Sequence, residues 1–218
     1  MEYTEGVRFD SLGLSPEIMR AIEKRNITVS TPVQAGCIPP MMDWQDVIAK
    51  APTGTGKTFA YGIPIVEHVD PEDESVQAVI LAPTRELAIQ ITDEIRDLAA
   101  FKPGVRSVCL YGGQPIGRQI DTLKKRPQIV VATPGRLSDH MKRRTVRLDK
   151  VQTVVLDEAD RMLDMGFVHD VKKVIAKLPA QRQNLMFSAT MPAEIEQLAA
   201  GILHDPAFVK VDPVSSTV

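Results

Sequence analysis

Short apolar runs alternate along the chain with longer segments in which apolar residues recur every three or four positions. The short runs are rich in valine, isoleucine and leucine at consecutive positions, as strands are when helices cover both faces of a parallel sheet. We predict strands at Val47–Ala51, Ala78–Ala82, Val105–Tyr111, Ile129–Ala132, Val154–Leu156, Leu185–Phe187 and Phe208–Val211. Strands that alternate with helical segments indicate a doubly wound α/β fold.

Two of the longer segments have a clear helical pattern. Within Glu86–Ala99 and within Ala193–Leu203, the apolar residues form one stripe along the predicted helix. Pro192 precedes the second segment, where its fixed φ suits a first helical turn. The last residues, Pro213–Val218, resemble a frayed tail. We therefore expect a single domain over residues 1–212 and a tail over residues 213–218.

Composition narrows the class of protein. A chain of 218 residues can form one domain or two small ones, and its 44% apolar and 25% charged residues are near the globular average. No apolar run approaches the roughly 18 residues that a membrane-spanning helix needs. The first residues also lack the basic and apolar regions of a secretory signal. We expect a cytoplasmic monomer that does not contact membranes.

Cysteine and histidine positions argue against a disulfide or metal scaffold. Cys37 and Cys109 both lie in apolar-rich segments, and we expect buried thiols rather than a bridge. The histidines are scattered without metal-ligand spacing, and we expect all of them at the surface. They are His68, His140, His169 and His204.

Charge is balanced overall but uneven along the chain. The net charge is −2, yet residues 67–97 hold nine acidic and two basic residues, and residues 118–150 hold ten basic and three acidic ones. Such runs are often solvated helix faces, but they also mark surfaces that meet a polyanion. The basic run at Lys142, Arg143, Arg144 and Arg147 therefore fits two interpretations, a helix end stabilised by the helix dipole and a set of phosphate contacts.

A glycine-rich loop follows the first predicted strand. Val47–Ala51 leads into Pro52-Thr53-Gly54-Thr55-Gly56-Lys57-Thr58, and a helical pattern begins there. Strand, glycine loop and helix start are the context of a phosphate-binding loop, or P-loop, although Ala51 replaces the usual first glycine. Glycines let backbone N–H groups converge on phosphate oxygens at a positive helix N-terminus. Lys57 would reach the β- and γ-phosphates, and Thr58 would coordinate Mg²⁺.

Two carboxylates follow the strand predicted at Val154–Leu156. Asp157 and Glu158 come directly after it, so they belong at the carboxyl edge of the sheet, where open α/β folds bind their ligands. Asp157 would hold Mg²⁺, and Glu158 would orient and deprotonate the attacking water. The pair alone is a weak signal, but together with the glycine loop it predicts phosphoryl-transfer chemistry.

Further segments, in order along the chain, resemble the motifs of the DEAD-box RNA helicases. Asp157-Glu158-Ala159-Asp160 spells the motif that gives that family its name. The other matching segments are Thr31–Gln34 with Phe9 (Q motif), Ala51–Thr58 (motif I), Pro83–Ala88 (motif Ia), Gly112-Gly113, Thr133–Arg136 (motif Ib) and Ser188–Thr190 (motif III). The resemblance covers nearly the whole chain. It implies a RecA-like P-loop NTPase domain with a mostly parallel central sheet and helices on both faces.

The resemblance also implies a role for each motif residue. ATP or ADP would be bound with Mg²⁺, with Gln34 reading the adenine edge and Phe9 packing near the base. The remaining nucleotide-binding residues would be Thr53, Gly54, Thr55, Gly56, Lys57 and Thr58, and Thr58 and Asp157 would hold the metal. The catalytic residues would be Lys57, Asp157 and Glu158. The sugar–phosphate backbone of RNA would follow Arg85, Gly112, Gly113, Thr133 and Arg136. Coupling between nucleotide and RNA would involve Asp160, Ser188 and Thr190, through hydrogen bonds to Asp160.

Two features qualify these expectations. Only 5% of the residues are aromatic, too few to stack successive bases, so RNA contacts should be with phosphates and sugars and carry little sequence information. The Q motif also departs from the family pattern, because Asn26-Ile27 replaces the usual glycine–aromatic pair and Ser30 replaces a proline. With Ile27 in place of an aromatic ring, we expect apolar packing against adenine and modest nucleotide affinity.

The family's active unit has two RecA-like lobes, and the second lobe carries the arginine fingers. This sequence resembles the first lobe, as far as Phe208–Pro213. We therefore expect an isolated N-terminal lobe without unwinding activity and with weak hydrolysis, because an arginine finger contributes about 10³–10⁵ in rate. Two functions stay open at this point: an ATPase lobe of an RNA-dependent motor, and a module that binds nucleotide or RNA without turnover.

Overall fold

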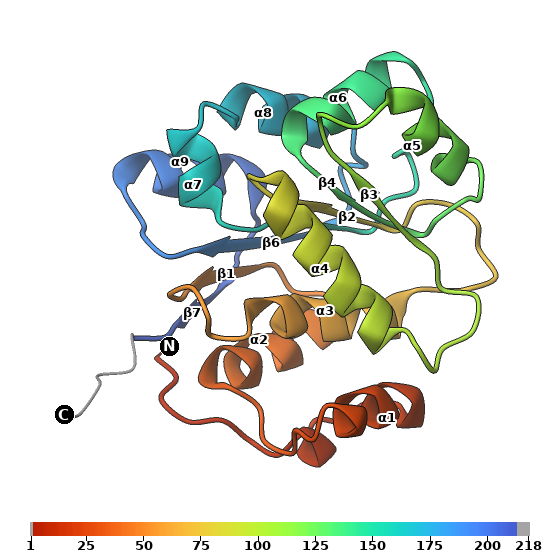
Figure 1. Cartoon of the computed structure of the whole chain (residues 1–218). Helices are drawn as coiled ribbons and strands as arrows, with labels where there is room; N and C mark the ends of the chain where they lie inside the picture. Colours follow the sequence, from red (N-terminus) through yellow and green to blue (C-terminus); the bar gives the residue numbers. More distant parts are fainter. Residues whose placement is uncertain (1, 213–218) are drawn as a thin grey trace.

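Each of the apolar runs forms one strand of a single sheet. The computed structural model describes residues 2–212, and the tail expected at 213–218 lies outside the described residues. The strands are β1 (Val47–Lys50), β2 (Ala78–Leu81), β3 (Ser107–Leu110), β4 (Ile129–Ala132), β5 (Thr153–Leu156), β6 (Gln183–Ser188) and β7 (Ala207–Lys210). Their order is β3-β4-β2-β5-β6-β1-β7, and every paired strand is parallel to its neighbour (Figure 1).

Helices connect the strands and cover both faces of the sheet. They are α1 (Pro16–Lys24), α2 (Pro32–Met42), α3 (Lys57–His68), α4 (Arg85–Leu98), α5 (Ile116–Leu123), α6 (Pro134–Lys142), α7 (Ala159–Asp164), α8 (Val168–Ala176) and α9 (Ala193–Ile202), preceded by a short 3-10 turn at Phe9–Ser11. The sequence suggested that Pro192 belongs to the first turn of α9. In the structure it lies one position earlier, at the N-cap. Among residues 2–212, no helix is long and apolar enough to cross a membrane.

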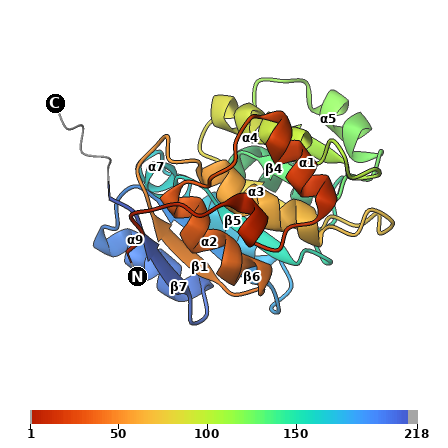
Figure 2. The same cartoon turned by 90° about the horizontal axis from the view of Figure 1, so that it is seen from below.

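Alternate strand residues divide the core into two layers. Val47 and Ala49 of β1 pack with α1–α4 on one face, whereas Ile48 packs with the helices of the other face. Figure 2 shows α1, α2 and α3 lying across the first face. Side chains on successive strand residues point to opposite faces, so a strand covered on both sides must be apolar throughout. This explains why the strands read as continuous apolar runs.

Side-chain caps fix where several helices begin. The Thr31 hydroxyl accepts a hydrogen bond from the Gln34 backbone N–H, and the Gln34 side chain accepts one from the Thr31 N–H, a complete capping box at the start of α2. The Thr84 hydroxyl caps α4 by accepting a hydrogen bond from the Leu87 N–H, without a bond in return. Both caps lie at the edge of the sheet where the candidate site is found.

Two expectations about buried residues need correction. His140 is fully buried rather than at the surface: its ring nitrogens contact the Thr145 hydroxyl at 2.8 Å and the Gln119 side-chain oxygen at 2.9 Å. Burial lowers the pKa of the His140 imidazole, which is therefore a neutral core residue. Both cysteines are free thiols as expected, but only Cys37 is buried, whereas Cys109 is half-buried on the edge strand β3.

Candidate functional site

A cavity of about 880 Å³ lies at the carboxyl edge of the sheet, next to the ends of β1 and β5. The loop after β1 lines it with Thr53, Gly54, Gly56, Lys57 and Thr58, and the end of β5 lines it with Asp157 and Glu158. Parallel strands bring segments a hundred residues apart to one edge, because all their carboxyl ends point the same way. The structure thus brings together the glycine loop and the acidic pair that the sequence predicted.

The glycine loop has the backbone of a phosphate cradle. Gly54 and Gly56 have φ values of +84° and +81°, a conformation that glycine adopts without strain. A Cβ at Gly56 would lie 2.5 Å from the Gln34 amide nitrogen, so a larger residue would clash there. Lys57 begins α3 and is buried. Thr55 does not line the cavity; its hydroxyl donates a hydrogen bond to the Pro52 carbonyl at 2.8 Å.

Three buried polar atoms of residues that line this cavity have no hydrogen-bond partner among the described residues. They are the Lys57 Nζ, the Asp157 Oδ1 and the Glu94 Oε2. An unpaired buried ammonium or carboxylate oxygen costs free energy, so each is expected to meet a ligand atom when the site is in use. A nucleotide phosphate suits Lys57, and Mg²⁺ with its water shell suits Asp157 and the Thr58 hydroxyl. The residues present therefore fit a Mg²⁺–nucleotide.

Asp157 is buried, and its second carboxylate oxygen is occupied. The Tyr61 hydroxyl donates to the Asp157 Oδ2 at 2.7 Å. Burial raises the pKa of the Asp157 carboxyl to about 6, although the hydrogen bond from Tyr61 and the charge of Lys57 both oppose the rise. The carboxylate is thus costly to ionise without a bound cation, and a cation would favour the ionised form.

Glu158 and Asp160 continue the acidic motif into α7. Glu158 has φ +49°, an uncommon backbone conformation for this residue type, and its carboxylate contacts the Arg161 guanidinium at 3.2 Å. Asp160 accepts hydrogen bonds from the Thr190 N–H at 3.1 Å and the Thr190 hydroxyl at 2.8 Å, while the Asp160 N–H donates to the Ser188 hydroxyl at 3.2 Å. The hydrogen bonds expected between Asp160 and Ser188–Thr190 are therefore present.

These hydrogen bonds also set the charge of Asp160. Burial by itself would raise the pKa of this carboxyl, but the hydrogen bonds from Thr190 outweigh it, and the pKa lies below its ordinary value. Asp160 therefore stays ionised at neutral pH. The pKa of Asp157 is thus shifted above the ordinary aspartate value and that of Asp160 below it.

Gln34 joins the start of α2 to the glycine loop at one side of the cavity. Its Oε1 accepts from the Thr31 N–H at 2.9 Å, and its Nε2 donates to the Gly56 carbonyl at 3.1 Å. These partners fix the amide orientation, because an N–H can face only the oxygen and a carbonyl can face only the nitrogen. Ile27 lines the cavity nearby, whereas Phe9 does not: its ring is buried in the core cluster.

A second group of predicted residues lies on the other half of the same edge, after β2, β3 and β4. The Arg85 guanidinium lies 4.9 Å from the centroid of the Tyr111 ring, and a Cβ at Gly113 would be 3.6 Å from the Arg85 Nη1. Arg136 donates to the Gln114 carbonyl at 3.2 Å. Thr133 occupies the N-cap position of α6 without a side-chain capping hydrogen bond, and nothing lies within 4 Å of a Cβ built at Gly112. Arginines and open backbone thus form one surface next to the cavity.

Comparison with known proteins identifies the family. Residues 31–198 match the family described as DEAD/DEAH box helicase. The chain belongs to the DEAD/DEAH box helicase family. It is 51% identical over 210 residues to the "DEAD-box ATP-dependent RNA helicase CshA" of Geobacillus kaustophilus, covering 96% of this chain and 45% of that protein. Identity to the Bacillus subtilis protein of the same name is 48% over 212 residues, covering 97% of this chain and 43% of that protein.

A solved structure agrees with this assignment. The crystal structure of a DEAD box protein from the hyperthermophile Methanococcus jannaschii superposes with a TM-score of 0.91 at 41% identity, over 96% of this chain and 57% of that one. The chain spans less than half the length of the CshA relatives. The predicted RecA-like α/β fold, with helices on both faces of its central sheet, is confirmed, and the chain corresponds to the N-terminal lobe of a DEAD-box helicase.

Several residues that line the 880 Å³ cavity were not predicted from the sequence. They are Arg25, Thr31, Phe59, Thr84, Glu86, Leu87, Gln90, Glu94 and Arg161. The Arg25 guanidinium lies over the Phe59 ring at 4.6 Å, next to the position of Ile27 in the cavity wall. No signal marked these two residues, because they become neighbours only when the segment before α2 packs against α3. Glu86, Gln90 and Glu94 did carry a signal, since their spacing of four residues places them on one face of α4.

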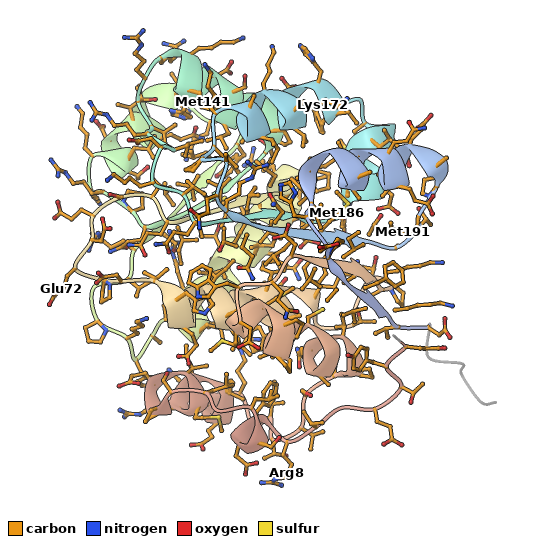
Figure 3. All side chains as sticks on the ribbon, turned by 180° about the vertical axis from the view of Figure 1, so that it is seen from behind. Arg8, Glu72, Met141, Lys172, Met186 and Met191 are labelled. Carbon is orange, nitrogen blue, oxygen red and sulfur yellow. The ribbon has the colours of Figure 1, made fainter. Side chains whose placement is uncertain are left out.

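The basic run after motif Ib does not join the arginine surface. α6 begins where β4 ends and leads back along the sheet, so Lys142 and Arg147 lie at the amino-terminal edge, opposite Arg85 and Arg136. There they border a separate cavity of about 740 Å³ between α6 and α8. Figure 3 shows Met141, which also lines this cavity, in the last turn of α6 beside α8. The concentration of positive charge in the sequence is therefore divided between two edges.

Proposed function

We propose that this chain is the ATP- and RNA-binding lobe of a DEAD-box RNA helicase whose two-lobed parent couples ATP hydrolysis to RNA duplex destabilisation or RNP remodelling. The observation that carries the proposal is the shared cavity, in which Lys57 Nζ and Asp157 Oδ1 are buried without partners beside the glycine loop. When bound, Mg²⁺ would neutralise phosphate charge and favour displacement at the γ-phosphorus. In this protein, Thr58 and Asp157 would hold the metal and Lys57 would hold the phosphates.

Glu158 is the residue proposed to orient and deprotonate the attacking water. Its carboxylate contacts Arg161 in the present arrangement, so one of its oxygens is held in place and the other can face the cavity. A base that is positioned in this way contributes mainly by orientation. Asp160, Ser188 and Thr190 would transmit changes at the nucleotide to the RNA surface, because their hydrogen bonds join the acidic motif to the end of β6.

Gln34 is the proposed adenine reader. A side-chain amide has two N–H donors and two acceptor lone pairs, and the contacts with Gly56 and Thr31 use one of each. The remaining N–H matches adenine N7, and the remaining lone pair matches the adenine N6 amino group. Guanine presents an oxygen where adenine presents N6–H, so it would face the acceptor of a fixed amide. Arg25, Ile27 and Phe59 would supply the packing that an aromatic partner supplies elsewhere.

RNA would bind through its backbone along Arg85, Gly112, Gly113, Thr133 and Arg136. Gly112 and Gly113 are exposed, so a sugar–phosphate chain can approach the protein backbone closely there. The arginines would then contact phosphates, which position the strand without reading its sequence. We also propose that the chain is cytoplasmic and monomeric, and that the parent supplies a second RecA-like lobe with the arginine fingers. The lobe alone would hydrolyse ATP slowly and would not unwind duplexes.

A calorimetric comparison of ADP and GDP in excess Mg²⁺ tests the adenine-specific site. We expect ADP to bind more tightly than GDP, with Gln34→Ala reducing the difference. Equal affinity for the two nucleotides would refute the adenine-reader assignment. A steady-state ATPase assay of the chain, with and without RNA, separates the ATPase lobe from the alternative of a binding module without turnover. RNA-stimulated turnover favours the first, and binding without turnover favours the second.

A further inference from the structure

Tyr61 occupies a position between three elements of the site. It lies on α3, one helical turn after Lys57, and its side chain is completely buried. Its hydroxyl donates to the Asp157 Oδ2 at 2.7 Å across 96 residues of sequence. Its ring meets the Phe187 ring edge-on, with centroids 5.2 Å apart. Phe187 belongs to β6 and immediately precedes Ser188 of motif III.

This packing prevents the Tyr61 hydroxyl from leaving Asp157. The ring is enclosed by the core cluster that includes Phe187, and a buried ring in close-packed surroundings has one available position. The hydroxyl donates the side-chain hydrogen bond to the Asp157 carboxylate, at Oδ2, and a backbone hydrogen bond from Glu158 also acts on this carboxylate. The contact therefore selects which Asp157 oxygen stays free, namely Oδ1, which is buried and unpartnered in the same cavity as Lys57 and Thr58.

We propose that Tyr61 is a positioning residue that fixes the Asp157 carboxylate so that Oδ1 alone is directed to the metal's ligand shell. This inference rests on the proposed Mg²⁺–nucleotide site and deepens it. A carboxylate that can rotate offers either oxygen in several orientations, and binding a metal must then select one of them. A carboxylate held on one side is already oriented. Partners that orient a metal-binding residue in this way commonly affect metal affinity by about 10–100-fold.

The matching experiment removes the hydroxyl and keeps the ring. Tyr61→Phe deletes one buried oxygen and preserves the contact with Phe187. ADP affinity of the 218-residue chain is measured by calorimetry with excess Mg²⁺ and again with the Mg²⁺ chelated, for wild type and variant. We expect the gain in ADP affinity from Mg²⁺ to fall about 10-fold in Tyr61→Phe. The Mg²⁺-free affinity should stay close to that of wild type, since Tyr61 does not line the nucleotide cavity.

Two further variants separate positioning from a merely structural role. Tyr3→Phe deletes a phenol oxygen on a residue that packs against Gly36 of α2, outside the cavity, and should leave both affinities unchanged. In an Asp157→Asn background, adding Tyr61→Phe should have no further effect on the Mg²⁺ gain, because Tyr61 acts through that carboxylate. If Tyr61→Phe proves unstable, the same comparison is made at a lower temperature where circular dichroism shows the variant folded.

The outcomes distinguish this inference from the function on which it rests. A wild-type chain whose ADP binding does not respond to Mg²⁺ would overturn the proposed site and the role of Tyr61 with it. A wild type that responds, with an equal response in Tyr61→Phe, would overturn the positioning role alone. Equal losses with and without Mg²⁺ would also overturn it, because they would show that the hydroxyl supports the fold of the cavity and not the metal-facing oxygen.

Discussion

Asp157→Asn should stabilise the protein more at neutral pH than at acidic pH. Burial raises the pKa of the Asp157 carboxyl from 3.8 to about 6. Each pKa unit corresponds to about 1.4 kcal/mol, so ionising Asp157 in the folded, ligand-free chain costs roughly 3 kcal/mol relative to the unfolded chain. Asparagine keeps an oxygen that can accept from Tyr61 but carries no charge. The variant therefore avoids this cost.

The sign of the pH dependence follows from proton binding. Between pH 3.8 and about 6 the folded state holds the Asp157 proton more tightly than the unfolded state, so wild-type stability falls as pH rises through this window. The free energy of unfolding of wild type should lose about 2 kcal/mol through Asp157 between pH 4.5 and 7.5. Urea denaturation of wild type and Asp157→Asn across this range measures it as a difference, in which the contributions of other titrating groups cancel.

Asp160→Asn is a matched control, because its effect on stability should have the opposite sign to that of Asp157→Asn. Hydrogen bonds from Thr190 hold the pKa of Asp160 below its ordinary value, so this carboxylate stabilises the fold above pH 3.8 and loses that contribution as pH falls. Asp160→Asn should therefore be destabilising at pH 7.5, with the effect shrinking toward low pH. If the difference between wild type and Asp157→Asn did not vary with pH, Asp157 would not be the buried carboxylate described here.

Two further predictions concern chemistry and RNA binding. In the two-lobed parent, Glu158→Gln should keep nucleotide affinity while hydrolysis falls by about 10² or more. Lys57→Ala should lose nucleotide affinity, because Lys57 is proposed to contact the phosphates before reaction. Equal affinity losses in stopped-flow nucleotide binding would make Glu158 a binding residue. Binding of single-stranded RNA should be insensitive to sequence. Arg136→Ala should weaken this binding and reduce the slope of log K against log salt by about 0.7. Lys142→Ala, at the opposite edge, should change neither the affinity nor the slope. Fluorescence anisotropy over a salt series measures both slopes, and an equal effect of Lys142→Ala would contradict the placement of the RNA surface.

The elements of the fold were predictable because local signals agree with the tertiary arrangement. The five inner strands are buried on both faces and so read as continuous apolar runs, whereas the edge strands β3 and β7 are partly exposed. The ends of the strands differ from prediction by at most two residues. The glycine loop was also predictable, since its function requires a local sequence of fixed spacing. Gly54 and Gly56 both have positive φ, as that spacing implies. In these cases the residues that interact are close together in the sequence.

Contacts between distant segments were not predictable in the same way. Tyr61 and Asp157 are 96 residues apart, and nothing in the sequence near either residue marks the pair. His140 was expected at the surface because the histidines show no metal-ligand spacing, yet the α6–α5 packing buries it against Gln119. Phe9 matched its motif by spacing, but the structure places its ring in the core and not in the cavity wall.

The basic run gives a different lesson, because its position did follow from the predicted topology. A helix that starts at the carboxyl end of a strand in a doubly wound fold must return to the amino-terminal edge before the next parallel strand. The nine residues of α6 cover about 13 Å, most of the depth of the sheet. Lys142 and Arg147 thus had to lie at the edge opposite Arg136. A count of charges along the sequence does not take into account which edge of the sheet the helix leads to.

The start of α4 places both candidate sites on one rigid element. Thr84 and Glu86 line the proposed nucleotide cavity, whereas Arg85 between them lies over Tyr111 on the proposed RNA surface. Successive residues of a helix point about 100° apart, so neighbours in motif Ia can serve different ligands. A ligand shifts a conformational equilibrium only if it binds two arrangements with different affinity. A movement of α4 would alter both sites together, because Arg85 and Glu86 are neighbours in its first turn. Motif Ia therefore links the two sites by geometry, before any second lobe is added.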